Sequence, residues 1–261
     1  MKFSSVAALT LVATAPFFAI AASAESDTHL DEAQAIFDWV SGSEDGFITP
    51  NLELRREIPG DATSPMGVYA TDTIETGEDI IKVPWNVILH SDDPNEPPSQ
   101  MVCGTVRTVA KEMRLGAESK YAPYILYLNN EADAQIPSTW SETAKELFHE
   151  ILAQSIGPSD PTGWIEDEWF GKCRGDPNDE VAVKAALMVI QRADDAIMIP
   201  GYDNMNHRNG NWTNADTEIE RGRFHHTTAT RTISPGEQIY ISYNFCEECG
   251  GRTSGYGTAG K

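Results

Sequence analysis

The sequence predicts an α+β fold in which short β-strands and hairpins enclose a helical insertion. Residues 52–89 and the residues after Ala196 have the turn-separated apolar runs of β-strands, whereas residues 100–190 have the apolar spacing of amphipathic helices. An eleven-residue segment that begins at Ala70 is also repeated from Ala229, on the far side of the helical block. Matching hairpins on both sides of a helical block indicate one β-rich domain with an insertion, and not separate domains joined by linkers.

The first 24 residues have the pattern of a signal peptide. They carry one Lys and no carboxylate, contain an apolar run from Val6 to Ile20, and end in Ala22-Ser23-Ala24. We therefore expect a protein of the secretory pathway or a secreted protein. No membrane span is expected after removal of the signal, because the run is too short for a transmembrane helix. A plastid reached through the secretory route is disfavoured, since residues 25–45 are acidic instead of basic and Ser-rich.

The elements justify the predicted architecture in chain order. Residues 25–50 are expected to form an N-terminal helix and lead-in, with the helix at residues 28–40 and Thr28 and Asp31 as a weak capping box. Its apolar face consists of Ala33, Ile36, Phe37 and Val40. A linker at residues 91–99 opens the helical insertion of about residues 95–192. Helices are expected at residues 101–115, 121–129, 141–156 and 180–192, and strands at 67–70, 80–83, 87–89, 197–199, 227–233 and 238–243.

The repeat relates residues 70–80 to residues 229–239, with seven of the eleven positions identical. Each copy has the pattern of a strand, a tight turn at Gly-Glu and a second strand. We expect the two hairpins to lie together and to close one β core. The alternative interpretation is that Ile-x-x-Gly-Glu is simply a good turn sequence.

The net charge limits the partners. After the first 24 residues, 18 Lys and Arg stand against 40 Asp and Glu, a formal charge of −22. Nucleic acid and anionic membranes are excluded as partners because their phosphates would be repelled. A basic protein or peptide remains possible, and an acidic surface kept for solubility is the alternative. Hydrophobic residues make up 40% of the chain, which excludes wholesale disorder.

The four cysteines fit two disulfides behind a signal peptide. Cys246 and Cys249 form a CxxC motif, but a structural zinc site needs two more ligands, and Cys103 and Cys173 lie far away in sequence. No metal site is predicted. The adjacent His225 and His226 are interpreted as surface residues on a strand, because neighbouring side chains there point to opposite faces.

Three segments carry a resemblance to a known family. They are residues 66–78 (MGVYATDTIETGE), 200–207 (PGYDNMNH) and 233–243 (ISPGEQIYISY). Together they resemble the SET-domain protein methyltransferases. The inserted residues 116–128 and 137–141, and Gln191-Arg192-Ala193, are similar to the branch with a helical insertion that includes the Rubisco large-subunit lysine methyltransferases. The resemblance implies a SET-type fold over residues 51–245, followed by a short tail at residues 246–261 that contains the CxxC motif.

The resemblance also implies an activity. A SET enzyme transfers the methyl group of S-adenosylmethionine to a protein lysine, or in some relatives a histidine. The amine, methyl carbon and sulfur must be held in line, which is mainly a positioning effect. By resemblance, Tyr243 is the catalytic tyrosine beside the methyl group and Tyr256 lines the substrate channel. The residues that would bind the cofactor are Met66, Gly67, Arg192, Asn206 and His207.

Several departures from the family motivate a second hypothesis, a secreted non-catalytic binding module on a SET scaffold. Pro65 stands where many members have the first glycine of Gly-x-Gly. No segment resembles the C-terminal helical domain with which this branch binds protein substrates. The signal peptide also separates the chain from the cytosol, where S-adenosylmethionine is made. A disulfide between Cys103 and Cys173, or within the CxxC motif, would favour this second hypothesis. Under either hypothesis we expect a monomer.

Overall fold

The computed structural model describes residues 27–93, 95–96, 101–132, 136–152 and 161–243. The predicted signal peptide, the Cys246–Cys249 motif and Tyr256 lie outside these residues. Among the helices in the described part of the chain, none is both long and apolar enough to cross a bilayer. Nor do three or more His, Cys, Asp or Glu side chains gather there in a way that could hold a metal ion.

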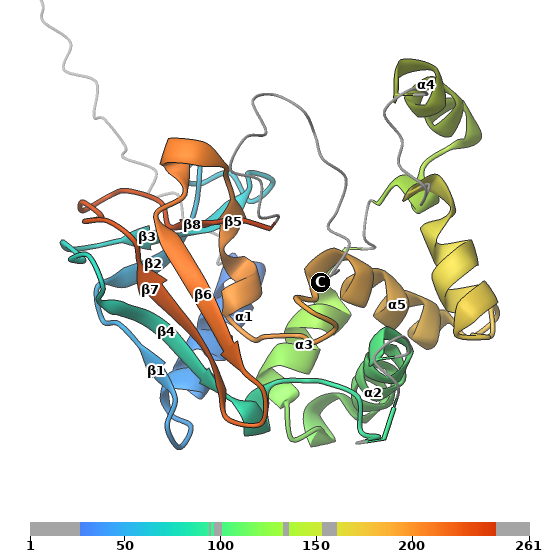
Figure 1. The fold of residues 1–261 in the computed structure, drawn as a ribbon, viewed down its shortest axis with the longest axis horizontal. Coiled ribbons are helices and arrows are strands. Elements are labelled where there is room, and N and C mark those ends of the chain that lie inside the picture. Colours follow the sequence, from blue (N-terminus) through green and yellow to red (C-terminus); the bar gives the residue numbers. More distant parts are fainter. Residues whose placement is uncertain (1–26, 94, 97–100, 133–135, 153–160, 244–261) are drawn as a thin grey trace, which may run out of the picture.

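The molecule has a β half and a helical half, which confirms the predicted α+β fold with an insertion (Figure 1). In the described residues the strands form a four-stranded antiparallel sheet and two two-stranded sheets. The four-stranded sheet has the order β1 (Phe47–Ile48), β4 (Asp79–Pro84), β7 (Phe224–Ala229), β6 (Ala215–Glu220). The antiparallel pair is β2 (Leu52–Arg56) with β3 (Met66–Ala70), and the parallel pair is β5 (Asn206–His207) with β8 (Tyr240–Ile241).

The N-terminal helix, α1 (Thr28–Ser41), lies against the β half and contacts the insertion helix α3 (Figure 1). The predicted apolar face of Ala33, Ile36, Phe37 and Val40 is buried, as expected. The predicted capping box is wrong, because Asp27 is the N-cap and its side chain accepts a hydrogen bond from the Leu30 amide at 3.2 Å. A carboxylate at this position satisfies a free helix amide and faces the positive end of the helix dipole.

The predicted insertion helices are present. They are α2 (Met101–Leu115), α3 (Ala122–Asn130), α4 (Glu142–Leu152) and α5 (Glu180–Arg192). Helix α2 packs against α5. A π-helix at Ile165–Lys172, where the sequence predicts no element, leads into α5 through a loop. Its C-cap, Cys173, forms a disulfide with Cys103 of α2, with 5.3 Å between the Cα atoms. One of the two expected disulfides is therefore identified.

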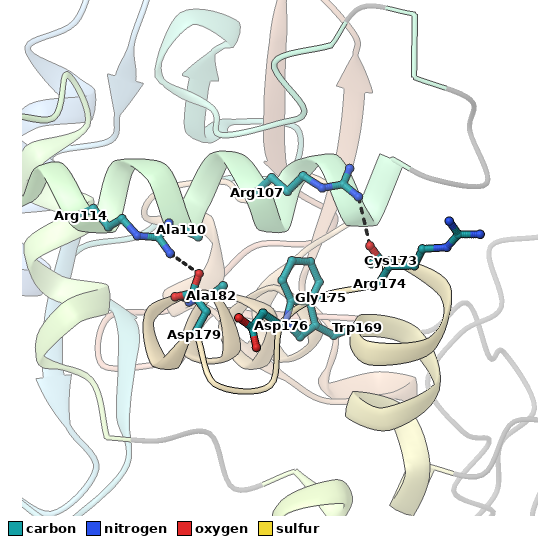
Figure 2. A pocket seen from close by; sticks show the side chains of 10 residues that line it. All are labelled: Arg107, Ala110, Arg114, Trp169, Cys173, Arg174, Gly175, Asp176, Asp179 and Ala182. Atoms are coloured by element: carbon teal, nitrogen blue, oxygen red, sulfur yellow. Dashed lines mark hydrogen bonds and ion pairs between the residues drawn. The ribbon is translucent and has the colours of Figure 1, made fainter.

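Beside this disulfide, α2, the π-helix and the start of α5 enclose a hollow of about 260 Å³ (Figure 2). Arg107 donates a hydrogen bond to the Cys173 carbonyl at 3.2 Å, and Arg114 forms an ion pair with Asp179. The disulfide and these two contacts fasten the last part of the insertion to α2. The hollow is thus braced by contacts that belong to the helical half.

The two copies of the repeat lie together, as predicted, and their backbone hydrogen bonds are reciprocal. Ile74 and Ile233 exchange both backbone hydrogen bonds, at 3.0 and 2.9 Å. The Gly77 amide donates to the Ala229 carbonyl at 2.7 Å, and the equivalent Gly236 amide donates to the Ala70 carbonyl at the same distance. Both glycines have φ angles above +80°, which favours glycine at the turn of each copy. The two hairpins close the β half on either side of the insertion.

Several predicted strands are displaced. Residues 85–87 form a 3₁₀ turn where a strand was expected from residue 87, because the segment after Pro84 turns towards the insertion. Leu89 and residues 197–199 still pair, through Leu89 and Met198. The strand predicted at residues 227–233 begins earlier, as β7, and β6 was not predicted because its alternating acidic residues lie on the exposed edge of the sheet. The prediction that His225 lies on the surface is wrong, because the residue is fully buried.

Candidate active site

The short parallel pair β5–β8 brings the three family-like segments together. Asn206 lies in register with Tyr240, and His207 with Ile241. The side-chain amide of Asn206 donates to the Met66 carbonyl at 2.9 Å, which ties β5 to the start of β3. The Ile239 amide donates to the Val68 carbonyl at 2.8 Å, so the third segment lies between the other two.

At Gly67, neighbouring side chains lie very close to the backbone. A Cβ atom at this position would lie 2.2 Å from the Gln238 side-chain nitrogen and 3.0 Å from that of Asn206. Gln238 in turn accepts a hydrogen bond from the Tyr240 hydroxyl at 2.6 Å. Only glycine fits at position 67, because any side chain would meet these two groups. The side-chain amides of Gln238 and Asn206 therefore lie directly against the Gly67 backbone. The predicted role of Gly67 as a point of close approach therefore has a geometric basis.

Tyr243 and His207 form a second group at the end of β8. Their rings stack with centroids 5.0 Å apart, and the Tyr243 amide donates to His207 Nδ1 at 2.9 Å. Because Nδ1 accepts this bond, the neutral imidazole carries its proton on Nε2. The Tyr243 hydroxyl donates to the Met205 carbonyl at 2.7 Å, while half of the residue remains exposed. The backbone amide and the hydroxyl of Tyr243 are thus both hydrogen-bonded, while about half of the residue remains accessible to a ligand.

The two groups lie on opposite faces of the β5–β8 pair. Side chains alternate along a strand, and residues paired in register share a face. Asn206, Tyr240 and Gln238 therefore share the face that meets Gly67, whereas Met205 and His207 point the other way. Asn206 and His207 were predicted to anchor the cofactor together, and the structure directs their side chains to different sides. A ligand could approach Gly67 on one face and a second ligand Tyr243 on the other.

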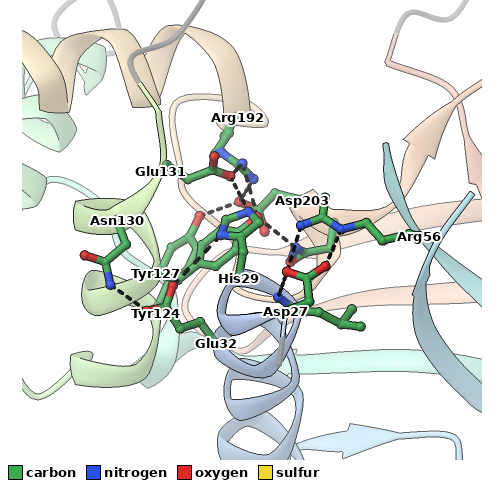
Figure 3. Close-up of polar contacts among 12 residues, drawn as sticks. Asp27, His29, Glu32, Arg56, Tyr124, Tyr127, Asn130, Glu131, Arg192 and Asp203 are labelled. Carbon is green, nitrogen blue, oxygen red and sulfur yellow. Dashed lines mark hydrogen bonds and ion pairs between the residues drawn. The ribbon is translucent and has the colours of Figure 1, made fainter. Parts of the chain in front are cut away.

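Arg192 lies in a different environment, a buried polar cluster between α3, α5 and the residues before β5 (Figure 3). Its guanidinium forms ion pairs with Glu131 and with Asp203, the latter at 3.2 Å. Asp203 also accepts from the Tyr124 hydroxyl at 2.7 Å, and His29 of α1 contacts Glu131 at 3.4 Å. The guanidinium that was predicted to contact cofactor or substrate is thus paired with two carboxylates.

The electrostatics of this cluster follow from burial and pairing. Burial alone would lower the pKa of Arg192, but the Asp203 carboxylate raises it above its ordinary value. Burial opposes the ionisation of Glu131, yet the hydrogen bond from His29 and the charge of Arg192 lower its pKa to about 2. Burial raises the pKa of Asp203 in spite of Arg192. Breaking such a pair would leave an uncompensated buried charge, so the cluster holds α1, α3 and α5 in place.

Two features of the site were not identified from the sequence. Gln238 lies next to predicted residues, but a single glutamine carries no motif. Glu131 gives no signal either, because the pairing with Arg192 joins residues that are 61 positions apart. The alternation of side chains in the third segment could have placed Gln238 beside Tyr240. The predicted channel residue Tyr256 lies outside the described residues, and its role stays a prediction.

Comparisons with known proteins agree with this geometry. The sequence model of the SET domain matches residues 66–244. Solved structures with a similar fold include Rubisco LSMT bound to AdoMet, with a TM-score of 0.53 and 17% identity. The SET domain of LSMT bound to methyllysine and AdoHcy is similar with a TM-score of 0.52 and 14% identity. Both comparisons cover 82% of this chain and 53% of the matched chain, so the chain spans about half the length of these structures. A search of curated proteins finds no significant match.

Proposed function

Because the chain belongs to the SET domain family, we propose that it is an S-adenosylmethionine-dependent methyltransferase acting on a lysine of a protein or peptide. One observation carries the proposal. The β5–β8 pair joins Met66, Gly67 and Asn206 on one face to Tyr243 at its end. The family fold, together with the fold likeness to Rubisco LSMT, makes S-adenosylmethionine the cofactor.

The residues of the chain fit this cofactor. When bound, S-adenosylmethionine supplies a methyl group on a positively charged sulfur. Gly67 leaves room for close contact with the backbone, and the Asn206 amide fixes the neighbouring loop by its bond to the Met66 carbonyl. Asn206 would hold the methionine part with its side chain on the Gly67 face, and His207 would do so with its backbone, because its ring points to the Tyr243 face. These residues orient the cofactor and do not take part in bond making.

Tyr243 and the nearby backbone would orient the amine. The lysine must arrive as a neutral amine, because an ammonium has no lone pair to attack the methyl carbon. A site that excludes water favours the neutral form. The Tyr243 hydroxyl, fixed 2.7 Å from the Met205 carbonyl, would lie beside the incoming nitrogen and help to align it with the methyl group. Rate enhancement would then come mainly from this alignment.

The test is calorimetric titration with S-adenosylhomocysteine, followed by a Tyr243→Phe variant. Folded protein that binds no S-adenosylhomocysteine would refute the proposal. We expect Tyr243→Phe to reduce methyl transfer by about 100-fold or more, the size expected for an oriented catalytic group, with cofactor affinity nearly unchanged. Tyr121→Phe, which removes the same atom from a buried tyrosine of the insertion, is the matched control and should keep its activity. Unchanged turnover in Tyr243→Phe would remove this residue from the catalytic role.

The substrate is proposed to be basic and the enzyme monomeric. A formal charge of −21 for the whole chain favours association with a cationic segment. Lysine and histidine peptides should be compared directly, since relatives in the family act on either residue. Methylation of histidine peptides alone would replace lysine in the proposal. We also propose a signal peptide at residues 1–24, a SET domain at residues 51–245 and a short tail at residues 246–261.

A second candidate function is a secreted, non-catalytic binding module, and the Cys103–Cys173 disulfide favours it. Disulfides persist in oxidising compartments, whereas S-adenosylmethionine is made in the cytosol. Peptide mapping of the native protein without reduction would detect the bridge. Localisation of the protein with an intact N-terminus then distinguishes the two candidates. A bridged protein in the secretory pathway that binds no S-adenosylhomocysteine would establish the second.

A further inference from the structure

Helix α4 carries the most exposed hydrophobic side chains of the helical half. Leu147 is 54% exposed and Ile151 is 70% exposed, the largest fraction for a large hydrophobic residue in the described part of the chain. The two residues are four positions apart, so they lie next to each other and form what we call the outer face of α4. In Figure 1 this helix lies at the outer end of the helical half, away from the β half. Adjacent apolar side chains on a projecting helix indicate a surface for a partner.

The hydrophobic side chains of α4 do not hold the helix in the core. Helices α1, α2, α3 and α5 each bury hydrophobic residues there, whereas residues 142–151 contribute none and none of them packs against it. Phe148 instead makes an edge-to-face contact with Trp140, with ring centres 5.7 Å apart, and His149 shares a hydrogen bond with Thr162 at 2.9 Å. These contacts attach α4 to neighbouring turns and leave the outer face exposed. Because a helix of 11 residues is only marginally stable alone in water, a partner on this face would also stabilise it.

An acidic row runs beside the outer face. Glu146 and Glu150 each precede one of its two apolar residues, and their four-residue spacing places them side by side. Neither forms an ion pair with another described residue, whereas Glu142, at the start of the same row, is paired with Lys145 at 3.2 Å. Exposed carboxylates beside an apolar pair favour a partner whose apolar side chains are flanked by Lys or Arg. The formal charge of −21 for the whole chain strengthens this preference.

The same charges disfavour other occupants of the outer face. Two copies of α4 packed against each other would place two acidic rows close together, and like charges across an interface repel. An anionic membrane surface would be repelled for the same reason. A basic amphipathic helix satisfies both features at once, because its apolar residues cover Leu147 and Ile151 while its cations face Glu146 and Glu150.

We propose that the outer face of α4 is a docking surface for a basic, amphipathic helical segment of a partner protein. This inference goes beyond the proposed function and does not rest on it, because docking at α4 involves neither a cofactor nor the β5–β8 pair. A methyltransferase would use the surface to recruit a basic protein, and a non-catalytic module would use it as its binding surface. The inference gives the helical insertion a role of its own.

The test measures the binding of three labelled synthetic peptides by fluorescence anisotropy. The first peptide has Leu along one helical face, flanked by Lys; Glu replaces Lys in the second, and Ala replaces Leu in the third. We expect the first peptide to bind and the other two to bind at least about 10-fold more weakly, because each lacks one of the two complementary features.

Variants of the protein then locate the binding surface. The double variant Leu147→Ala/Ile151→Ala should weaken binding of the first peptide by about 10-fold or more, since it removes both apolar anchors but keeps a good helix former at each position. Glu146→Gln/Glu150→Gln should weaken it by about 3- to 10-fold and reduce the salt dependence of the affinity. The charge variant also tests the surface without altering the apolar residues of the helix.

Two variants outside the insertion are matched controls. Ile58→Ala alters a similarly exposed hydrophobic residue, and Glu218→Gln alters an exposed carboxylate of β6. Both should bind the first peptide like the unaltered protein. Equal losses in these controls would overturn the proposal, since they would show attraction to the acidic chain in general. Undiminished binding by Leu147→Ala/Ile151→Ala would overturn it as well.

Two further measurements distinguish the other occupants. If the unaltered protein is a dimer in analytical ultracentrifugation and Leu147→Ala/Ile151→Ala is a monomer, the outer face belongs to a second copy and the proposal is overturned. A lower urea midpoint of unfolding in this variant than in Ile58→Ala would assign the face to another segment of the chain, with the same consequence. Absence of S-adenosylhomocysteine binding would overturn the proposed function and leave the docking surface standing.

Discussion

The two copies of the eleven-residue repeat make the same backbone structure but lead to different parts of the molecule. Residues 70–80 continue into β4, in the middle of the four-stranded sheet. Residues 229–239 continue into β8, which carries Tyr240 and ends beside Tyr243. The seven shared residues include those that the hairpin needs, the central isoleucine and the glycine and glutamate of the turn. A position where the copies differ is therefore a place to look for function.

The glutamate of each turn illustrates the shared part. Glu78 accepts a hydrogen bond from the Glu75 amide at 2.8 Å, and Glu237 accepts the equivalent bond from Ser234 at 3.1 Å. The carboxylate closes the turn in both copies although the residue that donates differs. Because this bond is present in both copies, both hairpins have the same turn. The residues that follow the turn can therefore differ, and they belong to the sheet in one copy and to the site in the other.

The largest expected effect tests whether the two copies support the fold equally. Ile74 and Ile233 are both at most 1% exposed and pair with each other. We expect Ile74→Ala and Ile233→Ala each to lower the free energy of unfolding by about 2–5 kcal/mol, because each leaves a cavity in the same core. Urea unfolding followed by circular dichroism measures both. Ile58→Ala, at a residue 57% exposed, is the control and should cost less than about 0.5 kcal/mol.

A loss below about 1 kcal/mol in only one of the two isoleucine variants would break the comparison. The two hairpins would then have the same backbone structure but contribute unequally to the stability of the fold. Equal losses would support the view that the two copies close one core from both sides of the insertion.

The next effect concerns two adjacent histidines in β7, the strand that leads into the second copy. His225 is fully buried against Tyr202, and neither ring nitrogen has a hydrogen-bond partner among the described residues. Burial, and to a lesser degree His226, lowers the pKa of His225 to about 3. His226 instead faces Asp79 of the first copy, at 2.9 Å.

The sign of the pH dependence follows from this pKa. Below pH 6.5 the unfolded chain binds a proton at His225 that the folded chain refuses until about pH 3. The native state should therefore lose about 1.4 kcal/mol per pH unit as the pH falls from 6.5. His225→Phe removes this contribution, so its advantage over the unaltered protein should grow between pH 6.5 and 5. His226→Gln should show no such growth. Parallel stability profiles for His225→Phe and the unaltered protein would contradict the assignment.

The fold was largely predictable because its signals are local. Two insertion helices have the predicted bounds, since apolar spacing and flanking residues determine both. The pairing of the hairpins could be inferred because the repeat supplied the missing long-range information. By contrast, the burial of His225, the ion pairs of Arg192 and the contact of Gln238 with Gly67 depend on residues that meet only in the folded chain. For the same reason the site motifs were found, but not Gln238 beside them.

The smallest effect on stability is expected at a position where the two copies differ. Substitutions there test whether the second copy has a role in binding that the first copy lacks. Asp79 and Gln238 occupy equivalent positions, one paired with the half-buried His226 and the other lying against Gly67. Asp79→Ala and Gln238→Ala should each change the free energy of unfolding by less than about 1 kcal/mol, because each removes one polar contact outside the core. Only Gln238→Ala should weaken binding of S-adenosylhomocysteine, by about 3- to 10-fold, since it releases the Tyr240 hydroxyl. Calorimetry on the two variants measures this difference, and equal affinities would mean that the second copy serves the fold alone.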